Sequence, residues 1–273
     1  MKNLILLVAI SIMAGFVSAQ AAADKSVQAG LVTGFGLNFQ NMGTKLMSAN
    51  GVGNDLTIGA NVNFSFTETI GFTTGLEFDF ETLKYAPASD IVYYYYNDTE
   101  IRTEGETVNG DQLYHLVERT QKPVYLSIPT MILFRTHFIG YFRYFGKFGL
   151  RNSFLLSNKI NDIGFNFDLD ANPVAEQAAG LTSTENNENM TAGNEMLFFK
   201  SSVGLVGGAE WNFTGGTCLV GEIGYYYGFT PLHTNRKEEK EYLFTTDEFG
   251  GNFDYFSNKA TQGQLMLKLS ILF

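Results

Sequence analysis

The three histidines of this chain are its side chains best suited to acid–base chemistry. His115 has Asp111 and Glu118 close by in the sequence, while His233 falls in another long connection and His137 in a short one. A hydrolytic site holds a histidine beside a carboxylate, often with a serine or a second acid, in a rigid geometry. Proximity within a loop does not supply that geometry. We therefore expect solvated loop histidines, no catalytic residue and no enzyme.

The cysteine and the clustered acids indicate neither a metal nor a cofactor. The chain has one cysteine, Cys218, which excludes a disulfide framework and a cysteine-based zinc cluster, and we expect it to be a small apolar filler. Asn161-Asp162 and Asp168-Leu169-Asp170 carry oxygen ligands suited to calcium. Their spacing lacks the central glycine of an EF-hand loop, so we predict no metal site and no cofactor.

Eight segments with alternating apolar and polar residues position the charged side chains. A period of two is typical of a β-strand with one apolar and one polar face. The composition, with 29 Gly, 25 Phe and 14 Tyr against 5 Pro, also favours strands. Segment 124–134 is apolar on both faces, so its register is open. The segments are approximately 27–39, 55–66, 70–81, 124–134, 141–157, 197–213, 217–229 and 263–273.

The connections between these segments alternate between long and short. This layout predicts an all-β fold: an eight-stranded antiparallel transmembrane β-barrel with short periplasmic turns and long extracellular loops. A secreted β-sandwich also alternates, but it does not explain the asymmetry of the loops or the aromatic C-terminus. The long connections are 40–54, 82–123, 158–196 and 230–262, and the short ones are 67–69, 135–140 and 214–216.

Residues 1–19 predict a secretory signal peptide. A single positive charge precedes an apolar stretch, and small residues follow at the expected cut after Ala19, with a second candidate after Ala23. A membrane anchor is the alternative, but the stretch is short against the roughly 20 residues of a spanning helix. The expected domains are the signal peptide, 1–19, and the barrel, 20–273. An exported chain without such a helix spans a membrane only as a closed barrel, which predicts the outer membrane.

The apolar faces of the strands, if they contact lipid, send nine charged residues into the barrel. A buried unpaired charge is very costly, so these residues should form ion pairs. Eight strands leave room for side chains only, which predicts a plugged interior without an open pore. A proton or ion path is the alternative. The nine residues are Glu77, Asp79, Glu81, Lys147, Arg151, Lys200, Glu210, Glu222 and Lys268, with Arg143 as a further candidate.

The predicted outer loops are acidic. Residues 84–121, 158–196 and 231–259 hold 20 of the 28 acidic residues, and we expect them to form a solvated surface that faces lipopolysaccharide. Docking of a basic partner or of a larger complex is the sharper alternative. Tyr93-Tyr94-Tyr95-Tyr96 is expected to extend a strand into an interfacial aromatic belt. Without its first 19 residues the chain has 17 basic and 28 acidic residues, which excludes a nucleic-acid partner.

Three consecutive segments carry a family resemblance. Tyr125-Leu126-Ser127-Ile128-Pro129 with the following 131–134, then 148–157, and the glycine-rich 203–209 resemble successive strands of PorT-like outer-membrane barrels, which are common in Bacteroidetes. Ser127 departs from the family, which often has an acidic residue there. The resemblance covers most of the chain after residue 19 and implies a fold and a location. Some members are tied to type IX secretion.

The end of the chain and the family resemblance indicate the role and the partners of the protein. Leu269, Ile271 and Phe273 look like the sorting signal that the barrel-assembly machinery reads during biogenesis. We expect a structural or interaction role, as an accessory subunit of a surface or type IX-like secretion assembly. The alternative is a narrow barrel that binds or passes a small molecule or lipid at its extracellular end. The expected partners are outer-membrane lipid, lipopolysaccharide, and a protein at the extracellular loops or the periplasmic face.

Overall fold

The computed structural model describes most of the chain after the predicted signal peptide. Its described residues are 26–88, 91–167, 185–214, 217–234, 240–246 and 253–273. The predicted signal peptide, residues 1–19, lies outside the described residues. No helix among the described residues is long and apolar enough to cross a membrane.

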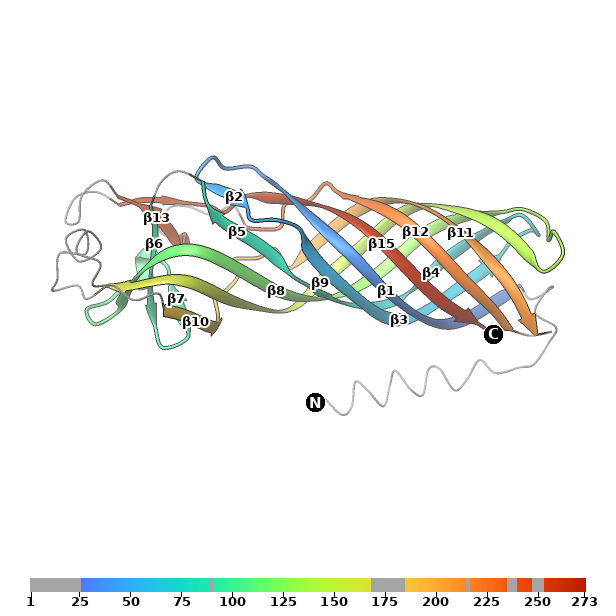
Figure 1. Ribbon diagram of the computed structural model, residues 1–273, viewed down its shortest axis with the longest axis horizontal. Coiled ribbons are helices and arrows are strands. Elements are labelled where there is room, and N and C mark those ends of the chain that lie inside the picture. The colour runs from blue at the N-terminus through green and yellow to red at the C-terminus, as the bar shows by residue number, and fades with distance from the viewer. Residues whose placement is uncertain (1–25, 89–90, 168–184, 215–216, 235–239, 247–252) are drawn as a thin grey trace.

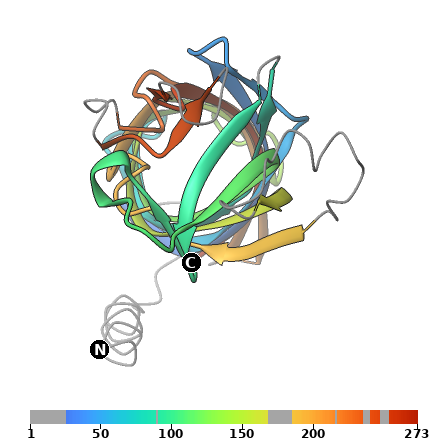
Figure 2. The same cartoon turned by 90° about the vertical axis from the view of Figure 1, so that its left-hand side faces the viewer.

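Eight strands close into a ring, which confirms the predicted barrel (Figures 1 and 2). Each strand pairs antiparallel with the next, and the last strand pairs with the first, so that Leu31 lies opposite Ile271. Closure leaves no unpaired edge in the ring. The eight strands are β1 (Val27–Met42), β3 (Gly53–Ser65), β4 (Ile70–Glu81), β8 (Gln112–Arg135), β9 (Phe142–Phe167), β11 (Phe199–Thr214), β12 (Thr217–Gly228) and β15 (Ala260–Leu272).

The outer wall of the ring is apolar, as the alternation predicts. Leu31, Ile58 and Leu205 are each more than half exposed, on three different strands. The register of β8 is now determined, because Met131 and Leu133 are buried inside while Ile132 is 47 % exposed. Apolar side chains in such an outward band are stable only against lipid.

Two strands continue far beyond the barrel. β8 has 24 residues and β9 has 26. Spanning the membrane takes about 9–11 residues, so more than half of each strand projects past it. Over residues 112–121, β8 pairs with β9 on one edge and with β5 (Leu83–Pro87) and β6 (Val92–Asn97) on the other. The prediction of loops over 82–123 and 158–196 was therefore wrong for much of their length.

We call this projecting part the extension. It lies at the end opposite the C-terminus, on the left in Figure 1. The β8–β9 hairpin pairs with short strands, so its backbone groups are satisfied outside the ring. The other elements of the extension are β2 (Met47–Ala49), β7 (Glu100–Arg102), β10 (Glu185–Met190), β13 (Leu243–Thr245), β14 (Asp254–Phe256) and the short 3₁₀ helix η2 (Glu104–Glu106).

The extension has a hydrophobic core of its own, and the four consecutive tyrosines belong to it. Tyr94, Tyr114 and Leu116 are fully buried in one cluster with residues from β5, β10 and β13. On the opposite face of β6, Tyr93 is 3 % exposed and packs against Phe244. The prediction of an interfacial aromatic belt at Tyr93–Tyr96 was wrong, because added strands cover both faces of β6.

Candidate functional site

The barrel lumen holds all nine charges that the sequence assigns to it. Each of the nine residues is at most 8 % exposed, and each forms at least one ion pair. The strands bring them together by parity: alternate residues face inward, so residues far apart in the sequence meet across the interior. Arg143, the further candidate, is also buried and pairs with Glu210.

Glu77 is the centre of the largest group of charges in the lumen. Its carboxylate accepts hydrogen bonds from Lys268 Nζ at 2.7 Å and from Arg151 Nη2 at 3.0 Å. Arg151 reaches Asp79 with the same nitrogen, at 2.5 Å. Thr57 donates to the other side of this group, to Asp79 Oδ1, at 2.7 Å. Two acids and two bases thus neutralise one another with no water needed between them.

Smaller groups lie on either side of this centre. Towards the extension, Lys200 Nζ binds Glu81 at 2.6 Å and Gln262 at 2.8 Å, and lies 3.8 Å from the ring centroid of Tyr125. Towards the short turns, Lys147 pairs with Glu222. The interior therefore contains several neutralised groups with aromatic rings packed among them.

The lumen also contains two charged residues that are not among the predicted ones. Arg135 lies 3.1 Å from Glu210, which also binds Arg143. Asp55 is fully buried and accepts a hydrogen bond from Gln264 at 3.4 Å. Arg135 was placed in a turn, whereas β8 continues through it, and Asp55 lies on the polar face of its segment. With these two and Arg143, the described lumen contains six acids and six bases.

A second polar cluster lies inside the extension. Arg119, fully buried, binds Asp162 at 2.8 Å and Glu195 at 3.2 Å. Gln121 donates from Nε2 to Glu195 at 2.9 Å, and its Oε1 lies 2.9 Å from His233 Nε2. Because the glutamine oxygen accepts, His233 Nε2 carries the proton and Nδ1 is left as an acceptor. His233 Nδ1 has no hydrogen-bond partner within the described structure.

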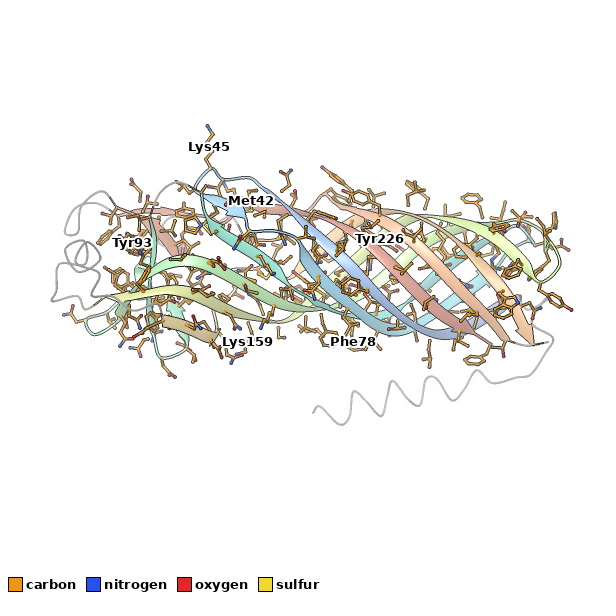
Figure 3. The ribbon with its side chains drawn as sticks, in the orientation of Figure 1. Met42, Lys45, Phe78, Tyr93, Lys159 and Tyr226 are labelled. Atoms are coloured by element: carbon orange, nitrogen blue, oxygen red, sulfur yellow. The ribbon has the colours of Figure 1, made fainter. Side chains whose placement is uncertain are left out.

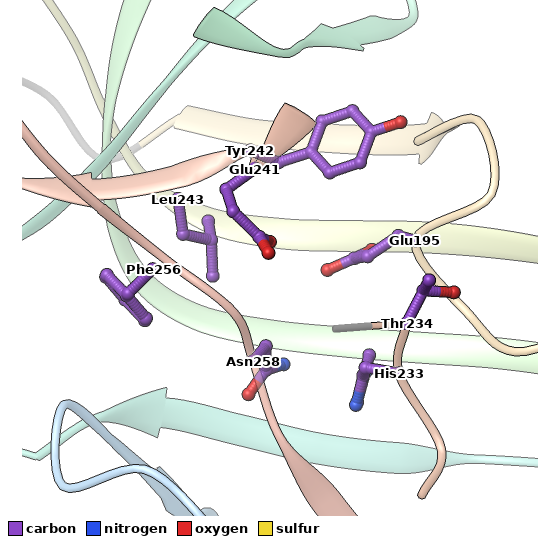
Figure 4. Close-up of a pocket in the computed structure, with 8 residues that line it drawn as sticks. All are labelled: Glu195, His233, Thr234, Glu241, Tyr242, Leu243, Phe256 and Asn258. Atoms are coloured by element: carbon purple, nitrogen blue, oxygen red, sulfur yellow. The ribbon is translucent and has the colours of Figure 1, made fainter. Parts of the chain in front are cut away.

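A small pocket opens beside this cluster (Figure 4). Its lining includes Glu195, His233, Glu241 and Asn258. The centre of a water molecule can move within about 10 Å³ of this pocket, so the pocket holds about one water molecule. Both polar atoms of the Asn258 amide are buried without a partner among the described residues. Burial, and to a lesser extent the charge of Arg119, lowers the pKa of His233 to about 3, while burial raises the pKa of Glu195. The histidine is therefore neutral at physiological pH.

The prediction of solvated histidines was wrong for two of the three. His233 is 2 % exposed, and His115 is 8 % exposed between the rings of Tyr93 and Phe165. They are buried by the extension, whose strands lack the alternation that would distinguish them from loops in the sequence. His137 is exposed at a short turn, 3.2 Å from Glu68. His233 is held by an amide rather than a carboxylate, which differs from the pairing of a hydrolytic site.

The remaining candidates for metal, redox or sorting roles have simple surroundings. Within the described ranges, no three His, Cys, Asp or Glu residues are grouped so as to hold a metal ion. Asp162 is engaged by Arg119, and Asp168-Leu169-Asp170 lies outside the described residues. Cys218 is a buried free thiol in an apolar cluster with Leu133. The proposed sorting residues point outward from the end of the barrel, and their role stays a prediction: Leu269, Ile271 and Phe273.

Comparisons with solved structures return other membrane barrels at low similarity. Ail, the attachment invasion locus protein of Yersinia pestis, in complex with the heparin analogue sucrose octasulfate, has 10% identity and a TM-score of 0.32, over 91% of this chain and 100% of that chain. Neisserial surface protein A (NspA) has 9% identity and a TM-score of 0.32, over 91% and 98%. The outer membrane protease OmpT from Escherichia coli has 11% identity and a TM-score of 0.31, over 94% and 99%.

A protein-family model matches most of this chain. No curated protein matches the chain. The model of the outer membrane protein beta-barrel domain matches residues 18–234, which is most of the sequence. The closed ring, its apolar wall and its paired interior agree with that description. The chain belongs to the outer membrane protein beta-barrel domain family and is a protein of the outer membrane.

Proposed function

We propose that this protein is a non-enzymatic barrel with a sealed lumen whose extension engages another protein. The observation that carries the proposal is the set of buried ion pairs in the lumen, which joins five acids to six bases. A transport route would leave hydrated charges along a path, whereas these charges are desolvated and neutralised by one another. The barrel then serves as an anchor for the extension.

The extension suits an interaction role because it is a rigid platform. It has its own buried core, so it presents a folded surface far from the membrane rather than mobile loops. The resemblance to PorT-like barrels suggests the class of partner: a component of a surface or type IX-like secretion assembly. The barrel-assembly machinery is the partner we expect during biogenesis, with Leu269, Ile271 and Phe273 in its sorting signal.

Two measurements test this proposal. In planar bilayers, the reconstituted protein should show no steady large conductance, and regular porin-like steps would contradict the sealed lumen. Extraction from membranes in mild detergent should recover a second chain in stoichiometric amount. The same preparation from a variant lacking the tip of the extension, residues 91–111, should lose that chain while the barrel persists.

Binding of a small molecule at the extracellular end is the second candidate function. The unpartnered His233 Nδ1 and Asn258 amide favour it, since they supply a free acceptor and a free amide inside a pocket. A larger adjoining groove of about 280 Å³ shares Glu241 and Phe256 with that pocket. A solitary barrel that co-purifies with a small ligand, lost in His233→Ala, would support this function over the first.

Enzymatic activity is tested separately. Peptide cleavage and lipid A profiles should be identical for the parent and for His115→Ala and His233→Ala. Loss of a measurable activity in either variant would reverse the assignment as a non-enzyme.

A further inference from the structure

Three lysines lie next to one another where the apolar wall ends. Along β8 from the barrel towards the extension, the outward residues are Leu126, Val124 and then Lys122. The neighbouring residue Gln121 points inward and is buried. Lys122 lies directly opposite Lys159 on β9. On the other side of β8, Lys84 of β5 lies opposite Thr120, two residues from Lys122. All three lysines are exposed.

The strand register sets the spacing of the three ammonium groups. Residues directly opposite across two strands have Cβ atoms about 5 Å apart, and diagonal neighbours lie about 7–8 Å apart. Lys122 thus has Lys159 opposite it and Lys84 on the diagonal of its other edge. Like charges placed directly opposite one another destabilise a strand pair. The arrangement therefore carries an unfavourable energy unless an anion occupies it.

The protein itself provides little compensation. Among the residues that the structure describes, no carboxylate lies within ion-pair distance of the three lysines, and Lys159 donates one long hydrogen bond, 3.5 Å, to the carbonyl oxygen of Asn189. Glu118 is on the same outward face of β8 but lies further from the apolar wall, opposite Ile163. This is notable in a chain whose net charge is −10.

The level of the lysines along the barrel axis indicates what kind of anion reaches them. They are the first charged outward residues met on their strands on leaving the apolar wall, two residues beyond Thr82, Val124 and Ser157. Figure 3 shows Lys159 towards the extension and Phe78 further back on the wall. Headgroups of the outer leaflet lie at this level, and lysine stems lie along apolar surface while their amines reach polar groups.

We propose that Lys84, Lys122 and Lys159 form a binding site for the phosphate groups of an anionic outer-leaflet lipid of the lipopolysaccharide type. One phosphate between two opposed lysines removes their repulsion, and the third lysine contacts a second phosphate or the same one from the side. An acidic protein segment is the competing ligand, but the position of the cluster against the acyl-chain band favours a lipid. The site requires only residence in the outer membrane and is independent of the proposed partner of the extension.

The test compares two triple variants with equal change in net charge. K84Q/K122Q/K159Q removes the cluster, and K45Q/K240Q/K259Q removes three other exposed lysines. Detergent-solubilised full-length protein is titrated with purified lipid A carrying two phosphates, and binding is counted by native mass spectrometry at low salt. The cluster variant should lose roughly 100-fold in affinity, since each lysine near an anionic surface contributes about fivefold. The control variant should stay within about threefold of the parent by the same reasoning.

Further measurements test whether binding depends on the phosphates of the lipid and on the positive charge of the three residues. Lipid A from which both phosphates have been removed should bind the parent weakly, and K84R/K122R/K159R should retain binding because its charge is unchanged. Equal binding by the cluster variant, equal loss in the control variant, or tight binding of the dephosphorylated lipid would overturn the proposal. Displacement of bound lipid A by a poly-glutamate peptide at lower concentration than by the lipid itself would assign the surface to an acidic protein, and would equally overturn it. Heat-modifiable migration confirms that each variant is folded.

Discussion

The replacement of Glu77 by glutamine is the sharpest perturbation of the lumen. Glutamine has the same shape, so packing is kept while one negative charge is removed. Arg151 retains Asp79 at 2.5 Å, but Lys268 loses both of its carboxylate contacts at 2.7 Å. Lys268 is 2 % exposed and keeps only the amide oxygen of the new glutamine, the ring of Tyr226 at 5.6 Å and the more distant charge of Glu222, which lies opposite it on β12.

The expected loss of unfolding free energy follows from a buried lysine that has lost its ion-pair partner. Breaking a buried ion pair by removing one partner costs about 3–5 kcal/mol, because the remaining charge stays desolvated. Removing both charges avoids that penalty, so E77Q/K268M should recover most of the loss. The difference between the double variant and the sum of the single ones should be about 2 kcal/mol or more, typical of groups in one network.

The assay uses the one tryptophan of the chain. Trp211 is on the outer wall of β11, so its fluorescence changes when the barrel leaves the lipid. Urea unfolding is measured in phosphatidylcholine vesicles for the parent, Glu77→Gln, Lys268→Met and the double variant. Glu68→Gln is the matched control, since it removes a carboxylate from an exposed pair with His137 and should leave the midpoint unchanged.

Two unfolding results would contradict a cost that arises from the unpaired charge of Lys268. A loss below about 1 kcal/mol in Glu77→Gln would mean that water screens Lys268 inside the lumen. A double variant no more stable than Glu77→Gln would mean that the cost arises from shape and not from charge.

Two further predictions concern the extension. Because the pKa of His233 is about 3 in the folded state against 6.5 unfolded, its stabilising effect is complete above pH 6.5 and is lost as the pH falls towards 3. From about pH 8 to about pH 5 the parent should lose about 2 kcal/mol more than His233→Gln in urea unfolding; equal slopes would contradict a buried neutral histidine. Leu116→Ala, in the buried core of the extension, should cost about 2–5 kcal/mol there and expose the extension to protease while the barrel keeps its heat-modifiable migration. Unchanged proteolysis would show that this core is not needed.

The barrel was predictable because its outer wall faces lipid and its inner wall faces a polar lumen. Lipid outside and a tight polar interior force a period of two on every strand, so Phe78 and Asp79 are assigned to opposite faces from the sequence alone. The same parity identified nine charges of the lumen. Arg135 was missed because the end of β8 was set one residue too early, and Asp55 was missed although it lies on the polar face of its strand.

The extension was not predictable by that rule. There, both faces of a strand are buried by other parts of the chain, so Tyr93 and Tyr94 are both apolar-packed and the alternation disappears. Without a period, 112–121 and 158–167 resemble loops, and the burial of His115 and His233 remains hidden.

The sequence by itself therefore determined the barrel, its location and most of the charges that face inward, because each of these follows from the alternation along a single strand. Only the tertiary structure decided which acid meets which base. Lys268 and Glu77 are 191 residues apart, and Lys122 lies opposite Lys159 through the register of two long strands. Such pairings depend on closure of the ring and on register between strands, and neither is encoded in the pattern of any one segment.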